Sequence, residues 1–287
     1  MLAIILNGLS YGMLLFLAAA GLTIIMSTLR KINFAHGSIF MLGSYLTIEV
    51  LEWLPGTFKS IYLAFLGALI IVGIIGGVIE KSLKWLGERE KVYEILLTYS
   101  FVLIIYDGAH ILFGAGGRFI ETPSYLQGGI RIASITFPKI GIFIIIVGVM
   151  VAVGVWIFLN KTRIGLLSRG ISFDEETART LGINTKLIFS LIFILGCSIT
   201  GLGGAISGMW IPVTPYMWEL ILLQSFCVVI IGGVGSLFGA FVGSILVGLI
   251  TSFLVTYESR IAMIVIFLIT VIVLKIRPSG IFGRETL

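Results

Sequence analysis

The sequence predicts an all-α polytopic membrane protein, a transmembrane helical bundle of about eight or nine spans, some of them discontinuous or re-entrant. Hydrophobic residues make up 58% of the 287-residue chain and charged residues only 11%, and the mean hydropathy is +1.15. A soluble protein of this composition would expose large apolar patches to water. The apolar runs are mostly long enough to cross the hydrocarbon layer of about 30 Å, which needs roughly 20 helical residues. We therefore expect one integral membrane domain over residues 1–287.

Nine spans are expected in order along the chain. The first apolar run, Leu2–Leu29, is too long for the core of a cleavable signal peptide and lacks a basic leader, so it is taken as a true span. The seventh span is short, and with the eighth it also fits a re-entrant hairpin that dips from the outside. The predicted spans are 2–27, 34–52, 60–79, 93–113, 139–159, 187–208, 218–232, 241–257 and 260–275.

The distribution of Lys and Arg predicts the orientation of these spans. When the loops alternate between the two sides, one assignment puts 14 basic residues inside and 5 outside, which is the bias typical of cytoplasmic loops. It places the N-terminus outside and the C-terminus in the cytoplasm. A re-entrant seventh and eighth pair leaves this parity unchanged. The net charge of +5 follows from the same bias and gives no support to nucleic-acid binding. The inside residues are Arg30, Lys31, Lys81, Lys84, Arg89, Lys91, Lys161, Arg163, Arg169, Arg179, Lys186, Lys275, Arg277 and Arg284, and the outside residues are Lys59, Arg118, Arg131, Lys139 and Arg260.

The longest outer loop, 115–138, is punctuated by Gly and Pro and contains a predicted β-hairpin over Gly129–Phe137. Such a loop either receives an external protein or caps the helix bundle. The sequence leaves both open.

The cytoplasmic loop 161–186 predicts a short amphipathic helix. Ser172-Phe-Asp-Glu175 fits a capping box, in which the Ser hydroxyl and the Glu carboxylate satisfy free amides at a helix start. The acidic run from Asp174 to Glu176 complements the positive end of that helix, and Gly182 is well placed to end it.

The apolar face of this predicted helix indicates a partner. Phe173, Thr177 or Ala178, and Leu181 fall about four residues apart on one side. Two turns of helix are not stable alone in water, and a stripe containing the small Ala178 suits insertion into a groove. The alternative is a helix lying on the membrane surface, which three consecutive acids disfavour at an anionic leaflet.

Glycine patterns predict close helix contacts and a helix break. Gly235, Gly239 and Gly243 recur every four residues, which lets helices approach closely. The preceding segment contains Gly232 and Gly233 and predicts an unwound entry to this helix, because glycine adopts open backbone angles at little cost. Tight packing without a transport role is the ordinary explanation.

The first inside turn, Asn33-Phe34-Ala35-His36-Gly37, also predicts a discontinuous helix. Asn33 is expected to cap a helix whose first turn holds His36 and Gly37. Broken helices of this kind line substrate paths in transporters. A lone His at a helix end is more often a structural hydrogen-bonding group than a ligand.

Taken together, these segments resemble the integral permease subunits of ABC importers for branched-chain amino acids. They cover nearly the whole chain in the expected order, and the length of 287 residues resembles the shorter of the family's two paired permeases. The matching segments are Gly21-Leu-Thr-Ile-Ile, Lys31-Ile-Asn-Phe-Ala-His-Gly37 with Met41-Leu-Gly-Ser-Tyr45, the loop Arg169–Asn184, and Ile231–Gly243.

The resemblance implies a multi-pass protein of the cell membrane that works with a second permease subunit, homologous or identical. It also implies two cytoplasmic ABC ATPase subunits, which use ATP and Mg, and an extracytoplasmic substrate-binding protein. The permease itself would bind no cofactor or metal and would have no catalytic residue. The implied ATPase-coupling residues are Asp174, Glu175, Ala178 and Gly182, with Phe173 on the predicted apolar face, and the implied residues of the pathway or its gate are Asn33, Phe34, His36, Gly37, Gly232, Gly233 and Gly235.

Other functions are less well supported by the residues. The chain lacks the Walker sequence, so nucleotide hydrolysis must belong to a partner, and it lacks a paired catalytic or metal-binding constellation. An ATP-independent secondary carrier would couple to protons through Asp107, His110 or Glu49. Asp107 and His110 lie outside the family pattern, and their spacing permits a mutual hydrogen bond. Urea and short amides remain alternative substrates.

Overall fold

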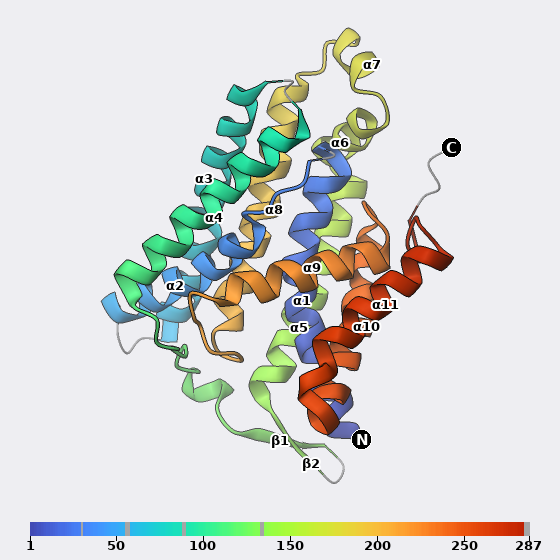
Figure 1. Ribbon diagram of the computed structural model, residues 1–287. Helices are drawn as coiled ribbons and strands as arrows, with labels where there is room; N and C mark the ends of the chain where they lie inside the picture. The colour runs from blue at the N-terminus through green and yellow to red at the C-terminus, as the bar shows by residue number, and fades with distance from the viewer. Residues whose placement is uncertain (30, 55–57, 88–89, 133–134, 284–287) are drawn as a thin grey trace.

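The computed structural model describes residues 1–29, 31–54, 58–87, 90–132 and 135–283. Within them the chain forms eleven α-helices, two short 3-10 helices and one β-hairpin, which confirms the predicted all-α bundle (Figure 1). Arg30, Arg89 and Arg284 of the predicted inside set, and 133–134 at the tip of the predicted hairpin, lie outside the described residues. The α-helices are α1 Leu2–Leu29, α2 His36–Trp53, α3 Phe58–Leu86, α4 Lys91–Phe113, α5 Lys139–Lys161, α6 Arg163–Phe173, α7 Glu175–Thr180, α8 Thr185–Ser207, α9 Met217–Gly232, α10 Leu237–Glu258 and α11 Ala262–Ile276.

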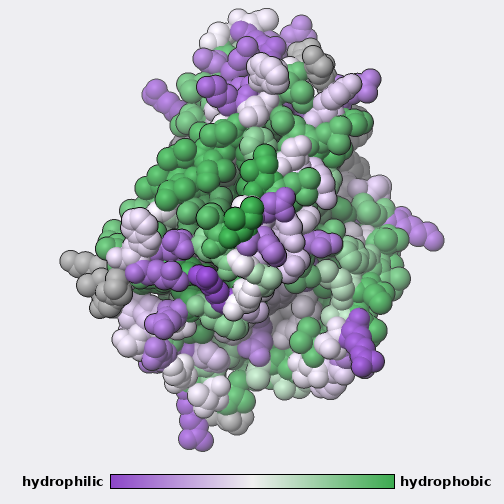
Figure 2. All heavy atoms as spheres, turned by 60° about the vertical axis from the view of Figure 1, so that its left-hand side comes forward, coloured by the Kyte–Doolittle hydropathy of each residue, from purple (hydrophilic) through white to green (hydrophobic). Residues whose placement is uncertain are grey.

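Helix α1 forms the centre of the bundle. Its side chains from Met13 to Ile25 are all buried, whereas α4 turns large apolar side chains such as Ile104 and Ile111 outward. Figure 2 shows hydrophobic atoms over a broad area of this flank, below a hydrophilic cap at the top of the molecule. Outward apolar side chains are expected for a protein whose solvent is lipid.

Among the described residues, six stretches are long and apolar enough to cross a membrane, judged by length and composition. The last of them contains both α10 and α11, joined by the 3-10 helix Ser259–Ile261. Helix α9 has 16 residues, or about 24 Å at 1.5 Å per residue, so it is short for a full crossing as predicted. The six stretches are Leu2–Leu29, Ser60–Leu86, Lys91–Phe113, Lys139–Lys161, Thr185–Ser207 and Leu237–Ile276.

The two ends of the bundle carry different structures. Helix α7 lies at one end, and the N-terminus and the β-hairpin lie at the other (Figure 1). This arrangement fits the predicted placement of the loops on opposite sides, although the sidedness itself stays a prediction. The predicted hairpin is confirmed: β1 Gly129–Ile132 pairs antiparallel with β2 Ile135–Pro138.

The loop 115–138, which is predicted to lie outside, is hydrogen-bonded to the segment that follows α8. Arg118 and Val213 exchange two backbone hydrogen bonds of 3.0 and 2.7 Å, and the amide of Ile120 donates to the Gly208 carbonyl at 2.9 Å. The Ile120 side chain is buried. These contacts favour the interpretation of the loop as a cap that closes this end of the bundle.

Glycines bring helix backbones into direct contact. A Cβ atom added to Gly43 of α2 would lie 2.1 Å from the Gly201 carbonyl oxygen of α8, and one added to Gly239 of α10 would lie 2.0 Å from the Gly232 oxygen of α9. The close packing predicted for the glycine stripe is therefore confirmed at Gly239. Gly235 is an exception, because it lies in the turn before α10 and not on that helix.

Candidate functional site

The loop 161–186, which is predicted to be cytoplasmic, folds into two short helices in place of the one predicted. Thr162 caps α6 by accepting a hydrogen bond from the Gly165 amide at 3.1 Å, and Asp174 caps α7 by accepting from the Thr177 amide at 3.0 Å. The predicted helix start at Ser172 is therefore wrong by two residues. The Ser172 hydroxyl donates back to the Arg169 carbonyl inside α6, so the cap role passes to Asp174, whose backbone is extended.

Gly182 ends α7, as predicted. Its φ of +81° is left-handed backbone, which glycine adopts without penalty. The Gly182 amide donates to the Arg179 carbonyl at 3.0 Å, and the Ile183 amide donates to the Ala178 carbonyl at 3.1 Å. These two bonds form a Schellman motif, which satisfies carbonyls that the helix end would otherwise leave unpaired.

The predicted apolar stripe does not form as one surface. Phe173 and Leu181 are 87% and 74% exposed, but Ala178 is only 5% exposed. Ala178 packs with Ile171 of α6 and Ile188 of α8 in a buried cluster. The prediction failed because Asp174 ends one helix and begins the next. The spacing of about four residues from Phe173 to Leu181 therefore does not continue on one helix face.

Acidic groups accompany the exposed apolar side chains of this segment. Glu175 forms an ion pair with Arg179 at 2.6 Å, while Glu176 is exposed. Hydrogen bonds from the Thr177 side chain and amide lower the pKa of Asp174 below its ordinary value, so this carboxylate stays ionised at neutral pH. We use the name exposed α6–α7 surface for Phe173, Asp174, Glu176 and Leu181.

The turn before α2 is buried between other helices. The Asn33 side-chain oxygen accepts a hydrogen bond at 3.0 Å from the amide of Ala35, the residue immediately before the helix. The predicted cap role of Asn33 is therefore wrong: α2 begins at His36, and its N-cap position is Ala35, with no side-chain bond. Asn33 instead stabilises the turn that leads into the helix.

His36 fastens the start of α2 to two neighbouring helices. Its Nε2 lies 2.7 Å from the Ala18 carbonyl oxygen of α1 and 3.1 Å from Thr200 Oγ1 of α8. A carbonyl only accepts, so Nε2 carries the proton. The Thr200 hydroxyl itself donates to the Gly196 carbonyl at 2.9 Å. Among the described residues, His36 Nδ1 and Asn33 Nδ2 are buried without a hydrogen-bond partner.

Two further residues of this turn contact α9. The ring of Phe34 lies 5.9 Å from that of Phe226, measured between centroids. A Cβ atom added to Gly37 would lie 2.2 Å from the Trp218 carbonyl oxygen. The turn is therefore enclosed by α1, α8 and α9, and it allows no larger residue than glycine at position 37.

The predicted break between α9 and α10 is confirmed. Helix α9 ends at Gly232, and Gly233 and Gly235 have φ values of +104° and +82°. The carbonyls of Ile231 and Gly232 accept hydrogen bonds from the amides of Ile281 and Phe282 at 2.9 and 3.0 Å. The C-terminal segment therefore satisfies the backbone groups that the break exposes, as a membrane interior requires.

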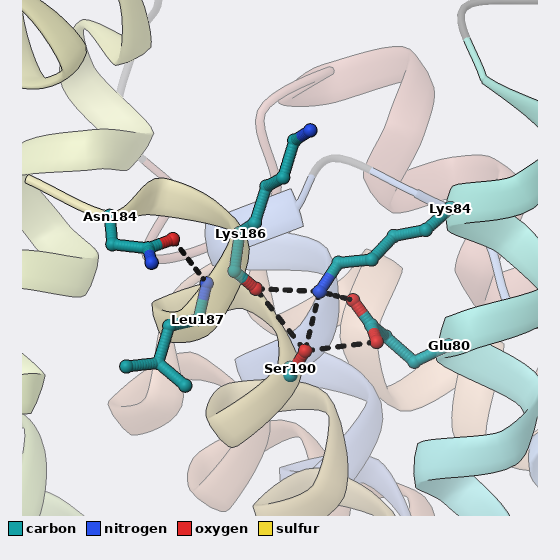
Figure 3. Close-up of polar contacts among 6 residues, drawn as sticks. All are labelled: Glu80, Lys84, Asn184, Lys186, Leu187 and Ser190. Atoms are coloured by element: carbon teal, nitrogen blue, oxygen red, sulfur yellow. Dashed lines mark hydrogen bonds and ion pairs between the residues drawn. The ribbon is translucent and has the colours of Figure 1, made fainter.

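The structure also contains a polar cluster that the sequence pattern does not predict. Glu80 and Lys84 of α3 meet Ser190 of α8 near the start of α8 (Figure 3). The i, i+4 spacing of Glu80 and Lys84 is a visible signal for an ion pair, but Ser190 is distant in sequence. Asp107 and His110, by contrast, are exposed on α4, and the hydrogen bonds of the described residues include none between them.

Comparisons with known proteins relate this chain to transport permeases. The profile of the family described as "Branched-chain amino acid transport system / permease component" matches residues 4–274. The chain is 28% identical to the high-affinity branched-chain amino acid transport system permease protein LivH of Salmonella typhimurium, over 97% of this chain and 94% of that protein. It is 26% identical to the corresponding protein BraD of Pseudomonas aeruginosa, with the same coverage. The solved structure of PsaBC from Streptococcus pneumoniae in complex with Fab is similar with a TM-score of 0.49 and 14% identity, over 92% of this chain and 89% of that chain.

Proposed function

This chain belongs to the permease component family of branched-chain amino acid transport systems, and we propose that it is one of two permease subunits of an ABC importer for those amino acids. It acts as a single permease domain over residues 1–287 in the cell membrane, with loop 161–186 as its cytoplasmic coupling element. Two ABC ATPases hydrolyse ATP with Mg, and an extracytoplasmic binding protein delivers the substrate. The chain itself binds no cofactor and carries out no covalent chemistry.

The main support for the proposed coupling role is the exposed α6–α7 surface. Phe173 and Leu181 present large apolar side chains on a segment rich in charged residues. Two caps, the Schellman motif and the buried Ala178 hold this segment in place. Burying one such side chain on a partner stabilises a complex by about 1.5–3 kcal/mol. A preordered surface of this kind suits a partner with an apolar groove.

The charges of the same surface specify the rim of that groove. Asp174 and Glu176 lie at the start of α7, where their negative charges add to each other. Glu175 is already paired with Arg179 within the helix. The complementary partner surface is therefore an apolar groove with Lys or Arg at its edge.

The proposed pathway uses the two discontinuous helix starts. The turn 33–37, with Asn33, Phe34, His36 and Gly37, and the break at Gly232, Gly233 and Gly235 both involve α9. Among the buried side chains of the described residues, Glu80 alone carries a charge. A pathway with few fixed charges suits small zwitterions such as branched-chain amino acids, because a fixed charge would retain an ionic substrate.

Co-purification with a co-expressed ABC ATPase of the proposed importer tests the coupling role. Wild type and Phe173→Ala are solubilised in detergent with the co-expressed ATPase. The control is Trp85→Ala, which removes another exposed aromatic side chain, 90% exposed, near the end of α3 beside the start of α8. We expect Phe173→Ala to weaken the complex about tenfold or more and Trp85→Ala to leave it unchanged.

Two results would contradict the proposal. The first is a well-folded wild type that retains no ATPase. The second is a Phe173→Ala variant that binds the ATPase as tightly as wild type does. Uptake that continues without ATP would instead favour a secondary carrier.

A further inference from the structure

The cluster of Glu80, Lys84 and Ser190 joins α3 to the first turn of α8 (Figure 3). Lys84 Nζ lies 2.9 Å from Glu80 Oε1 and donates to the Lys186 carbonyl at 2.7 Å and to Ser190 Oγ. The Ser190 hydroxyl donates to Glu80 Oε2 at 3.0 Å. All three hydrogens of the Lys84 ammonium group thus have an acceptor.

This cluster differs from an ordinary surface ion pair. The Glu80 side chain is only 5% exposed, and a buried carboxylate is costly unless it is paired and hydrogen-bonded. Glu80 receives both an ammonium group and a hydroxyl. Lys84 donates to a backbone carbonyl of α8 as well as to the Ser190 side chain. The contact therefore restrains the backbone of the helix and not only the rotamer of Ser190.

Helix α7 is attached to the same turn of α8. Arg179 Nε donates to Thr185 Oγ1 at 3.3 Å, and Ala178 belongs to the same buried cluster as Ile188. The Asn184 side chain caps α8 by accepting from the Leu187 amide at 3.1 Å. Only the four residues 181–184 separate α7 from α8. A movement of α7 therefore also displaces the first turn of α8.

Below the cluster, α3 and α8 remain in close contact. A Cβ atom added to Gly73 would lie 2.3 Å from Ser198 Oγ, and one added to Gly76 would lie 2.5 Å from the Cys197 Cβ. Further along α8, Thr200 contacts His36 at the start of α2. Helices packed this closely shift as units, because interiors are dense and deform little.

We propose that Glu80, Lys84 and Ser190 are positioning residues for coupling, which fix the first turn of α8 to α3. A movement of α7 imposed by the ATPase then displaces α3 and α8 together, and α8 carries it to the turn 33–37. Without the cluster, the first turn of α8 moves independently of α3. Part of the movement driven by each ATP hydrolysis is then not transmitted to α3. This inference rests on the proposed coupling role of the exposed α6–α7 surface.

The experiment uses the full importer, with both permeases, the ATPases and the binding protein, reconstituted in liposomes. It measures leucine uptake and ATP hydrolysis in the same vesicles, so that uptake per ATP is obtained. The variants are Lys84→Met, which removes the ammonium group, Lys84→Arg, which keeps the charge and donors, and Ser190→Ala, which keeps the ion pair. The control is Lys81→Met, because Lys81 is exposed on the same helix and enters none of the polar contacts of the described residues.

We expect Lys84→Met to assemble with the ATPase and to lower uptake per ATP by about threefold to tenfold. Ser190→Ala should lower it by about twofold, Lys84→Arg should restore most of it, and Lys81→Met should match wild type. The inference is overturned if uptake and hydrolysis fall in equal proportion in the Lys84→Met and Ser190→Ala variants, since that is the result of a purely structural role. Failure of the wild type to bind the ATPase would instead overturn the proposed function on which the inference rests.

Discussion

Gly204 of α8 lies so close to Phe40 of α2 that a Cβ atom added to the glycine would stand 1.8 Å from the Phe40 carbonyl oxygen. Nearby, the Ser44 hydroxyl of α2 donates to the Gly204 carbonyl at 2.7 Å. The two helices therefore meet backbone to backbone. Because α8 starts at the end of the α6–α7 segment and α2 starts at the turn 33–37, this contact joins the two candidate functional regions.

Replacement of Gly204 by Ala should destabilise the protein. The added methyl group must separate two packed backbones, and overpacking of this kind costs about 1–3 kcal/mol. The matched control is Gly154→Ala on α5, where an added Cβ meets no atom within 4 Å. We expect a lower unfolding temperature in detergent for Gly204→Ala and an equal or higher one for the control. Equal unfolding temperatures for Gly204→Ala and wild type would contradict the contact.

The sequence predicted the helix end and the helix break that depend on glycine at a position of positive φ. Gly182, Gly233 and Gly235 all have positive φ, and a glycine is readable as a helix end or break without knowledge of the fold. The start of α7 was mispredicted because Ser172 and Asp174 are both good caps, two residues apart. Which of them acts depends on where α6 ends, and the sequence pattern predicts only one helix in this segment.

Sequence periodicity does not predict which distant segments contact each other. The burial of Ala178 depends on Ile171 and Ile188, which lie on two other helices. The partner of the Glu80–Lys84 pair, Ser190, is more than a hundred residues away in sequence. Both relations appear only when α8 is placed beside α3 on the one hand and beside α6 and α7 on the other.

Replacement of His36 by Leu should loosen the start of α2. The variant leaves Thr200 and the Ala18 carbonyl without the imidazole donor in a buried environment, and a lost buried hydrogen bond costs about 1–3 kcal/mol. His36→Gln retains a side-chain donor and should recover part of the stability. Thermal unfolding of the two variants against wild type measures the difference. A proton-carrier role for His36 predicts instead that both variants abolish uptake at unchanged stability.

The cap of α7 should depend on pH through Asp174. Hydrogen bonds from Thr177 lower the pKa of Asp174 in the folded state, so its contribution to the stability of α7 is present above the unfolded pKa and is lost as the pH falls through the folded one. We expect the Thr177 and Ala178 amides to exchange hydrogen faster in wild type below the usual carboxyl pKa range. The Asp174→Asn variant retains a capping oxygen that does not titrate, so its exchange should not show this additional acid dependence. An identical acid dependence in both proteins would exclude Asp174 as its source.

Replacement of Ile281 by Pro should destabilise the break between α9 and α10. Proline has no amide hydrogen, so the Ile231 carbonyl, which accepts from Ile281 at 2.9 Å, loses its donor next to the left-handed Gly233. Leaving a buried carbonyl unpaired costs about 1–3 kcal/mol. Ile281→Ala keeps the amide and removes only side-chain contacts, so it separates the two contributions. We expect Ile281→Pro to unfold at a lower temperature than Ile281→Ala and to lose more leucine uptake in reconstituted vesicles. If the two variants behave alike, the C-terminal segment holds the break through its side chains and not through its backbone.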